Sequence, residues 1–150
     1  MLYARHLCAE LPSAVVIFFM RFQTNQKPRP ELTQAEREAI VDLLNFCLYA
    51  DSHIALREGE FMSDVVDFIG WETQSSFGSY EGRSVSNARA AKESAETKKE
   101  FLAYAAGRLP SKEARALAIE LCRQLFAVDG ATAQEEAALL GEIRSALESV

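Results

Sequence analysis

Residues 33–48 read TQAEREAIVDLLNFCL, and this stretch decides the class of fold. Thr33 and Glu36 have the spacing of a capping box, in which the two residues satisfy amide groups at a helix N-terminus. The apolar residues that follow recur with a period of about 3.6 residues, which marks one face of a helix. They are Ile40, Leu43, Leu44, Cys47 and Leu48. The pattern predicts an amphipathic helix that ends near Asp51.

Four more segments carry helix-forming patterns. Helical apolar spacing runs from about Arg57 to Ile69, and Gly70 suits the left-handed residue that ends a helix. Residues 85–108 are rich in alanine, lysine and glutamate, a composition typical of helices. Ser111 is the predicted N-cap of a helix that Gly130 ends, and the last helix opens at the capping-box residues of 132–135.

The segments between these helices carry no strand pattern. Residues 73–83 (TQSSFGSYEGR) predict a loop that Phe77 and Tyr80 attach to the body of the protein, and the charged run 90–100 predicts a solvated face. No segment alternates convincingly between apolar and polar residues with period 2. The sequence therefore predicts an all-α protein, a compact bundle of about five helices.

Composition and charge limit the class of protein. With 150 residues, of which 49% are apolar, the chain can form one globular domain with a real core. A net charge of −6 argues against nonspecific nucleic-acid binding, because phosphate contacts need a basic face. The three cysteines, Cys8, Cys47 and Cys122, have neither disulfide-framework nor zinc spacing, and Cys47 and Cys122 are predicted to be buried thiols. Free core thiols indicate a cytoplasmic protein.

The first 30 residues form a predicted extension and linker, and the helical domain spans 31–150. The apolar run 14–20 (AVVIFFM) has seven residues, too few for a stable membrane span, which needs about 20. Three interpretations of the start remain open: translation from Met20, which makes residues 1–19 an upstream artefact; an ordered extra segment; and a signal or anchor. The stretch 23–30, with two prolines, is the linker.

An internal repeat relates the two halves of the chain. With an offset of 78 residues, AIVDLLNFCLYADSHIALREGEFMSDVVDFI (39–69) aligns with LAIELCRQLFAVDGATAQEEAALLGEIRSAL (117–147). Apolar positions match in kind along the whole alignment. Four positions are identical in the two halves: Leu43 and Leu121, Asp51 and Asp129, Ala55 and Ala133, and Glu58 and Glu136. The bundle therefore consists of two helix–acidic loop–helix halves.

The repeated acids suggest a metal site. Each half places an aspartate at the end of one helix and a glutamate in the first turn of the next: Asp51 with Glu58, and Asp129 with Glu136. If the halves meet around a pseudo-twofold axis, these four carboxylates converge and need a cation among them. Oxygen ligands favour calcium or magnesium over zinc, although the spacing is not that of an EF-hand.

A structural explanation stands beside the metal site. Acids at helix N-termini are stabilised by unpaired amides and the helix dipole, and Asp-Gly is a common turn. Glu135 is expected to serve such a capping role, while Glu60 and Glu135 are also second-rank ligand candidates. His53 is either a flanking ligand or an exposed loop residue.

The segments LYADSHIALREGEFM and FAVDGATAQEEAALL resemble the acidic helix–loop–helix signature of tellurite-resistance TerB-like proteins. The resemblance covers residues 31–150 and implies an all-α fold, a metal site at Asp51, Glu58, Asp129 and Glu136, and a role in tellurite or other chemical stress. Two departures are Ser52, where the pattern has glycine, and Val128, where alanine is typical.

Three functions follow from these patterns. The first is a cytoplasmic stress-response module that binds a divalent metal ion. The second is a protein-interaction domain without metal, which would place partners of a stress-response assembly on an apolar patch formed by Phe77, Tyr80 and the first 22 residues. The third and weakest is a carboxylate-based hydrolase or transferase, because the sequence contains no recognisable catalytic motif.

Overall fold

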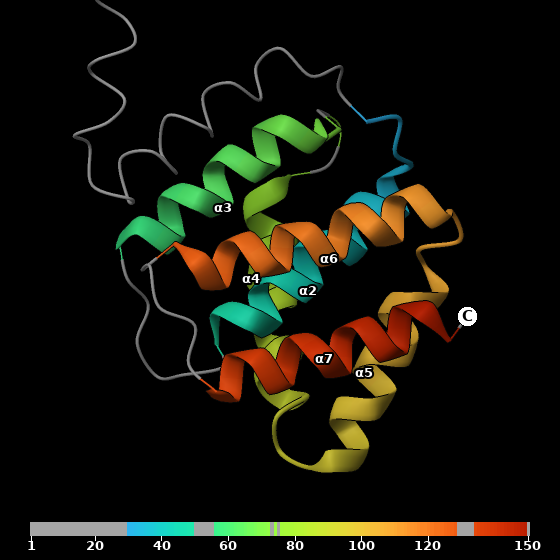
Figure 1. Cartoon of the computed structure of the whole chain (residues 1–150). Coiled ribbons are helices and arrows are strands. Elements are labelled where there is room, and N and C mark those ends of the chain that lie inside the picture. The colour runs from blue at the N-terminus through green and yellow to red at the C-terminus, as the bar shows by residue number, and fades with distance from the viewer. Residues whose placement is uncertain (1–29, 50–55, 73, 75, 129–133, 150) are drawn as a thin grey trace, which may run out of the picture.

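The computed structural model describes residues 30–49, 56–72, 74, 76–128 and 134–149. These ranges contain six helices and no strand (Figure 1). The helices are α2 (Gln34–Leu48), α3 (Leu56–Ile69), α4 (Phe77–Ala90), α5 (Ala95–Gly107), α6 (Lys112–Ala127) and α7 (Gln134–Glu148). The all-α prediction is confirmed, and the expected number of about five helices was close.

Two predictions about the middle of the chain were wrong in detail. Phe77 and the residues after it belong to α4, whose N-cap Ser76 accepts a hydrogen bond from the Ser79 amide at 3.4 Å. The predicted single helix 85–108 is divided between α4 and α5, because Ser94 caps α5 by accepting from the Thr97 amide at 3.0 Å. In both places a serine that looked like a loop residue acts as a helix cap.

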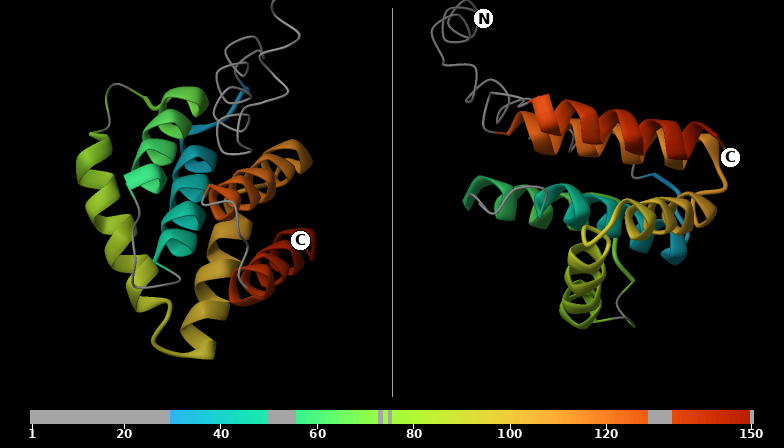
Figure 2. Two further views of the ribbon diagram at one scale, coloured as in Figure 1. Left: turned by 60° about the vertical axis from the view of Figure 1, so that its left-hand side comes forward. Right: turned by 90° about the horizontal axis from the view of Figure 1, so that it is seen from below.

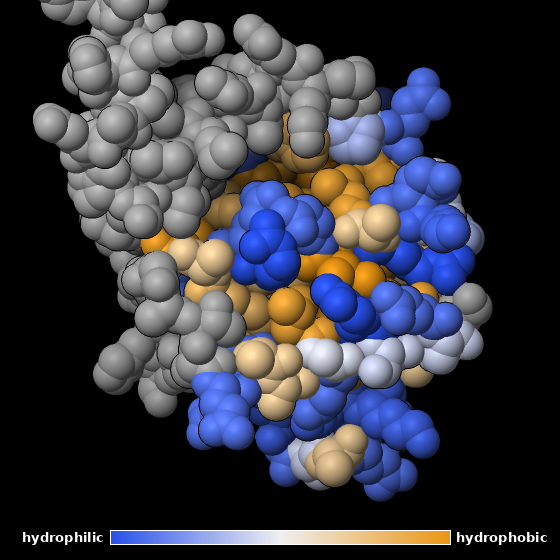
Figure 3. Space-filling view, in the orientation of Figure 1, coloured by the Kyte–Doolittle hydropathy of each residue, from blue (hydrophilic) through white to orange (hydrophobic). Residues whose placement is uncertain are grey.

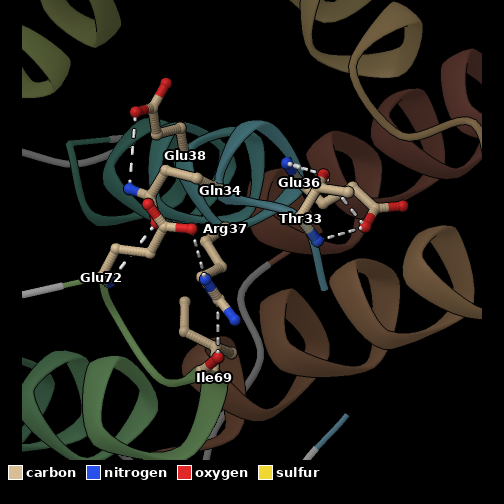
Figure 4. A network of polar contacts seen from close by, with 7 residues as sticks. All are labelled: Thr33, Gln34, Glu36, Arg37, Glu38, Ile69 and Glu72. Atoms are coloured by element: carbon tan, nitrogen blue, oxygen red, sulfur yellow. Dashed lines mark hydrogen bonds and ion pairs between the residues drawn. The ribbon is translucent and has the colours of Figure 1, made fainter. Parts of the chain in front are cut away.

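The predicted start of α2 is confirmed. Thr33 and Glu36 form both bonds of the capping box, with the Thr33 amide 2.8 Å from Glu36 Oε2 (Figure 4). One turn later Arg37 donates from Nε to the carbonyl oxygen of Ile69 at 3.0 Å and pairs with Glu72 at 3.6 Å. Gly70 has φ of 75°, as its predicted helix-ending role requires. The start of α2 is thereby attached to the end of α3.

Helix α2 is the centre of the fold. The helices α6 and α7 lie on one side of it and α4 lies on the other (Figure 2). Every residue from Ala39 to Leu48 is buried, so burial extends well beyond the predicted one-sided stripe. A helix surrounded by neighbours has no solvent-facing side, and its two polar residues, Asp42 and Asn45, are therefore buried as well.

Polar contacts attach α4 and α5 to α2 inside the protein. Asn45 donates from Nδ2 to Ser84 Oγ at 2.9 Å, and Asp42 pairs with Arg108 at the end of α5. Arg108 also donates to the Tyr80 hydroxyl at 3.3 Å. Burial lowers the pKa of Arg108, but its bonds to Asp42 and Tyr80 outweigh burial and raise it, so the guanidinium stays charged.

The predicted extension, the linker up to residue 29, and Cys8 lie outside the described residues. Among the helices that are described, none combines the length and the apolar character needed to cross a membrane.

Candidate functional site

The helix boundaries agree with the predicted offset between the halves. The helices α2 and α3 begin at residues 34 and 56, and α6 and α7 begin at 112 and 134, a difference of 78 in both cases. The N-caps Thr33 and Ser111 are separated by the same number of residues. The caps also meet in space, because Ser111 donates from Oγ to Glu36 Oε1 at 3.1 Å. The two starts are therefore joined at one end of the bundle.

The opposite ends of these helices face a common side of the molecule. Figure 1 shows the end of α2, the start of α3, the end of α6 and the start of α7 at its left-hand side, and the views in Figure 2 keep them together. We call this side the acidic pole, because the two predicted acidic loops connect these ends. Asp51, His53 and Asp129 lie outside the described residues.

The structure describes two of the four predicted ligands. Glu58 lies in the first turn of α3 and Glu136 in the first turn of α7, and both are partly buried. The second-rank candidates Glu60 and Glu135 are exposed. Within the described part of the chain, no three His, Cys, Asp or Glu residues are grouped so that they could hold a metal ion. A complete site therefore needs ligands from the acidic loops.

A cavity of about 490 Å³ opens between the N-terminal turns of α5 and α7. Its described lining combines apolar and charged side chains and includes Glu136, but not Glu58. An ion pair crosses from α5 to α7 at its edge, with Lys98 Nζ 2.7 Å from Glu142 Oε2. The lining residues are Phe46, Lys92, Ser94, Ala95, Lys98, Glu135, Glu136, Ala138, Leu139 and Glu142.

Lys92 is a functional candidate that the sequence did not reveal. It belongs to the charged run 90–100, much of which is exposed as predicted, but its Nζ atom is buried. The ammonium lies 5.5 Å from the centroid of the Phe46 ring, which in turn stacks on Phe101 with centroids 5.0 Å apart. A cation above an aromatic face is stabilised by the ring quadrupole. Charge patterning alone could not indicate this position, because Phe46 is distant in sequence.

The buried thiols Cys47 and Cys122 lie between α2 and α6, and their predicted burial is confirmed. Burial raises the pKa of Cys47 well above its ordinary value, and a hydrogen bond with Cys122 adds to this effect. Lys92 lowers the pKa of Cys47 and Glu136 raises it. Two opposite charges of the acidic pole therefore act on one buried sulfur, which places both near the end of α2.

Comparison with known proteins gives no match to a family model, to a curated protein or to a solved structure. The fold and the site define the class of protein directly: an all-helical domain in which two helix pairs with equal spacing share one pole. At that pole, Glu136 and Lys92 line one cavity.

Proposed function

We propose that this chain is a TerB-like module of a cytoplasmic chemical-stress system, such as tellurite resistance, and that it binds a divalent cation at the acidic pole. One observation carries the proposal: both helix pairs turn at the same side of the molecule, with the same spacing of helix starts. The acids Asp51, Glu58, Asp129 and Glu136 are the proposed ligands. Calcium and magnesium suit such a set, because hard cations prefer oxygen ligands.

The melting temperature tests this function. A ligand at 100 times its dissociation constant stabilises the native state by about 2.7 kcal/mol, which corresponds to a shift of roughly 5–10 °C in a domain of this size. We expect such a shift with calcium, magnesium or manganese, and we expect Asp51→Asn or Asp129→Asn to abolish it. An unchanged melting curve with all three metals in excess would remove the proposal.

A matched control separates metal binding from helix capping. Glu96 lies in the first turn of α5, as Glu58 and Glu136 do in α3 and α7. Replacing any of the three by Gln removes a favourable interaction with a helix dipole. Only Glu58→Gln and Glu136→Gln should also reduce the metal-dependent shift. If Glu96→Gln reduces it equally, the acids act through capping alone.

A second candidate function is protein interaction without metal. Figure 3 shows apolar surface along the seam between α6 and α7. The partly buried hydrophobic residues of these helices are Leu117, Ile119, Val128, Leu139, Leu140 and Ala146. The patch expected at Phe77 and Tyr80 is absent among the described residues, because both rings pack on Trp71, with centroids 5.1 and 5.2 Å away.

Co-purification tests the second candidate. We expect a partner to be retained by the whole chain and lost when Leu140 is replaced by Lys, because a charge on the seam opposes apolar contact. Removal of residues 1–22 tests whether the N-terminal segment contributes to the contact. Identical protein recovery with all three chains would count against this function.

A further inference from the structure

We propose that the ammonium group of Lys92 is a built-in counter-ion of the acidic pole, and that a divalent cation binds there in competition with it. This inference rests on the proposed function and adds a determinant of affinity to it. The metal would enter a pole that already holds a positive charge, not an uncompensated cluster of carboxylates.

The position of Lys92 is unusual for a lysine. It follows the end of α4 directly after the C-cap residue Ala91, in a segment whose next four residues are exposed. Its Nζ atom is nevertheless buried and lies 5.5 Å from the Phe46 ring centroid. Lysine normally keeps its ammonium in water, since removing a charge from water is costly unless negative charge or an aromatic face compensates. The surroundings of Lys92 must therefore be electronegative.

Glu136 supplies one such negative charge. It lines the same cavity as Lys92, and the two charges act in opposite directions on the Cys47 thiol. The other lysine of the cavity, Lys98, is engaged with Glu142 at 2.7 Å. Glu135 also lines the cavity, but it is exposed. Lys92 is thus the buried cation of the cavity that contains the proposed ligand Glu136.

A fixed positive charge next to a metal site weakens metal binding, because the two cations repel each other. The repulsion is substantial at short range in a partly buried site, where the effective dielectric constant is near 20. Replacing Lys92 by a neutral residue should therefore tighten metal binding, whereas most substitutions near a site weaken it. The direction of the effect distinguishes a competing charge from a residue that only supports the structure.

Isothermal titration calorimetry with calcium chloride and magnesium chloride tests the inference on the full chain. Lys92→Met and Lys92→Gln remove the charge, and both should bind at least one of the metals roughly tenfold more tightly than the wild type, equivalent to ~1.4 kcal/mol. Lys92→Arg keeps the charge and should bind like the wild type. Lys99→Met is the matched control, since Lys99 is exposed on α5, and its affinity should stay within about twofold of the wild type.

The outcomes separate the inference from the function beneath it. If the wild type binds metal and neither neutral variant at Lys92 binds more tightly, the counter-ion proposal is wrong and the metal site stands. If no variant binds calcium or magnesium at millimolar concentration, the proposed site for these ions fails, and the inference fails with it. Circular dichroism of each variant shows whether it is folded, and two neutral replacements guard against the failure of one.

Discussion

The helices α2 and α6 occupy corresponding places in the two halves, yet their polar residues have opposite environments. Asp42 of α2 corresponds to Glu120 of α6 at the offset of 78 residues. The Asp42 side chain is 5% exposed and pairs with Arg108 in the interior, whereas the Glu120 side chain is 46% exposed and pairs with Arg123 of its own helix at 2.6 Å. The same position is a buried link in one half and a surface contact in the other.

The difference comes from what covers each helix. The segment that contains α4 and α5 lies between the two halves in sequence, and it packs on the face of α2 that carries Asp42 and Asn45. The corresponding face of α6 carries Glu120 and Arg123, which form their ion pair at the surface. A repeat in sequence therefore does not require equal burial, because the inserted helices turn an outer face into core.

The largest expected effect is at this pair of positions. Asp42→Ala leaves the Arg108 guanidinium in the interior without its carboxylate partner, and we expect a loss of about 3–5 kcal/mol in the free energy of unfolding. Glu120→Ala removes an exposed partner of Arg123 and should cost less than about 1 kcal/mol. Urea denaturation followed by circular dichroism measures both. Equal losses at the two positions would refute the contrast between the halves.

The next pair of corresponding positions sharpens the comparison without a buried charge. Asn45→Ala deprives Ser84 of its 2.9 Å partner in the core, with an expected cost of about 1–3 kcal/mol. Arg123→Ala, at the corresponding position of α6, should change stability by no more than about 0.5 kcal/mol, apart from the loss of its surface ion pair. The same denaturation experiment applies. A larger loss at Arg123 than at Asn45 would contradict the burial of this face of α2.

The pH dependence of stability should report on α2 and its cover. Burial raises the pKa of Cys47 on α2 and of Tyr80 on α4 above their values in the unfolded chain. Each group stabilises the fold fully below its unfolded pKa and loses this contribution as pH rises, because the unfolded chain releases the proton first. The free energy of unfolding should therefore fall above about pH 9, by at most ~1.4 kcal/mol per pH unit for each group. Urea denaturation at several pH values measures the slope.

Tyr80→Phe and Cys47→Ala are the variants that test this slope. Each should be less stable than the wild type at neutral pH, but each should lose less stability between pH 9 and 11, because one titrating group is absent. If both variants keep the slope of the wild type, the titration of other groups controls the alkaline response, and α2 has no special part in it.

The smallest expected difference concerns the N-caps. Thr33→Ala and Ser111→Ala each remove a cap and should each cost about 1 kcal/mol. Ser111→Ala should cost slightly more, because Ser111 also donates to the buried carboxylate of Glu36 at 3.1 Å. Thermal unfolding compares the two variants. A clearly larger loss at Thr33 would show that the contact between the two caps contributes little.

The sequence predicted the features that depend on local patterns. The capping box at Thr33, the end of α3 at Gly70, and the burial of Cys47 and Cys122 all follow from neighbouring residues and helical spacing. The equal spacing of the helix starts in the two halves also agrees with the predicted offset.

The features that were missed depend on contacts between distant segments. The periodicity of α2 places Asp42 and Asn45 opposite its apolar stripe and so predicts that they are exposed, although α4 and α5 cover them. The charged run around Lys92 likewise gave no sign that its ammonium lies over Phe46. The convergence of Asp51 and Asp129 with Glu58 and Glu136 remains a prediction, because the first two lie outside the described residues.

Native mass spectrometry tests the central claim, that the two halves jointly bind a divalent cation, most directly. Spectra of the whole chain after chelation and after addition of calcium or magnesium read the metal content and the oligomeric state together. We predict one added divalent ion per chain, removed by the chelator and absent in the double variant Asp51→Asn, Asp129→Asn. A mass that equals the bare chain at every metal concentration, or an ion retained by the double variant, would contradict the claim.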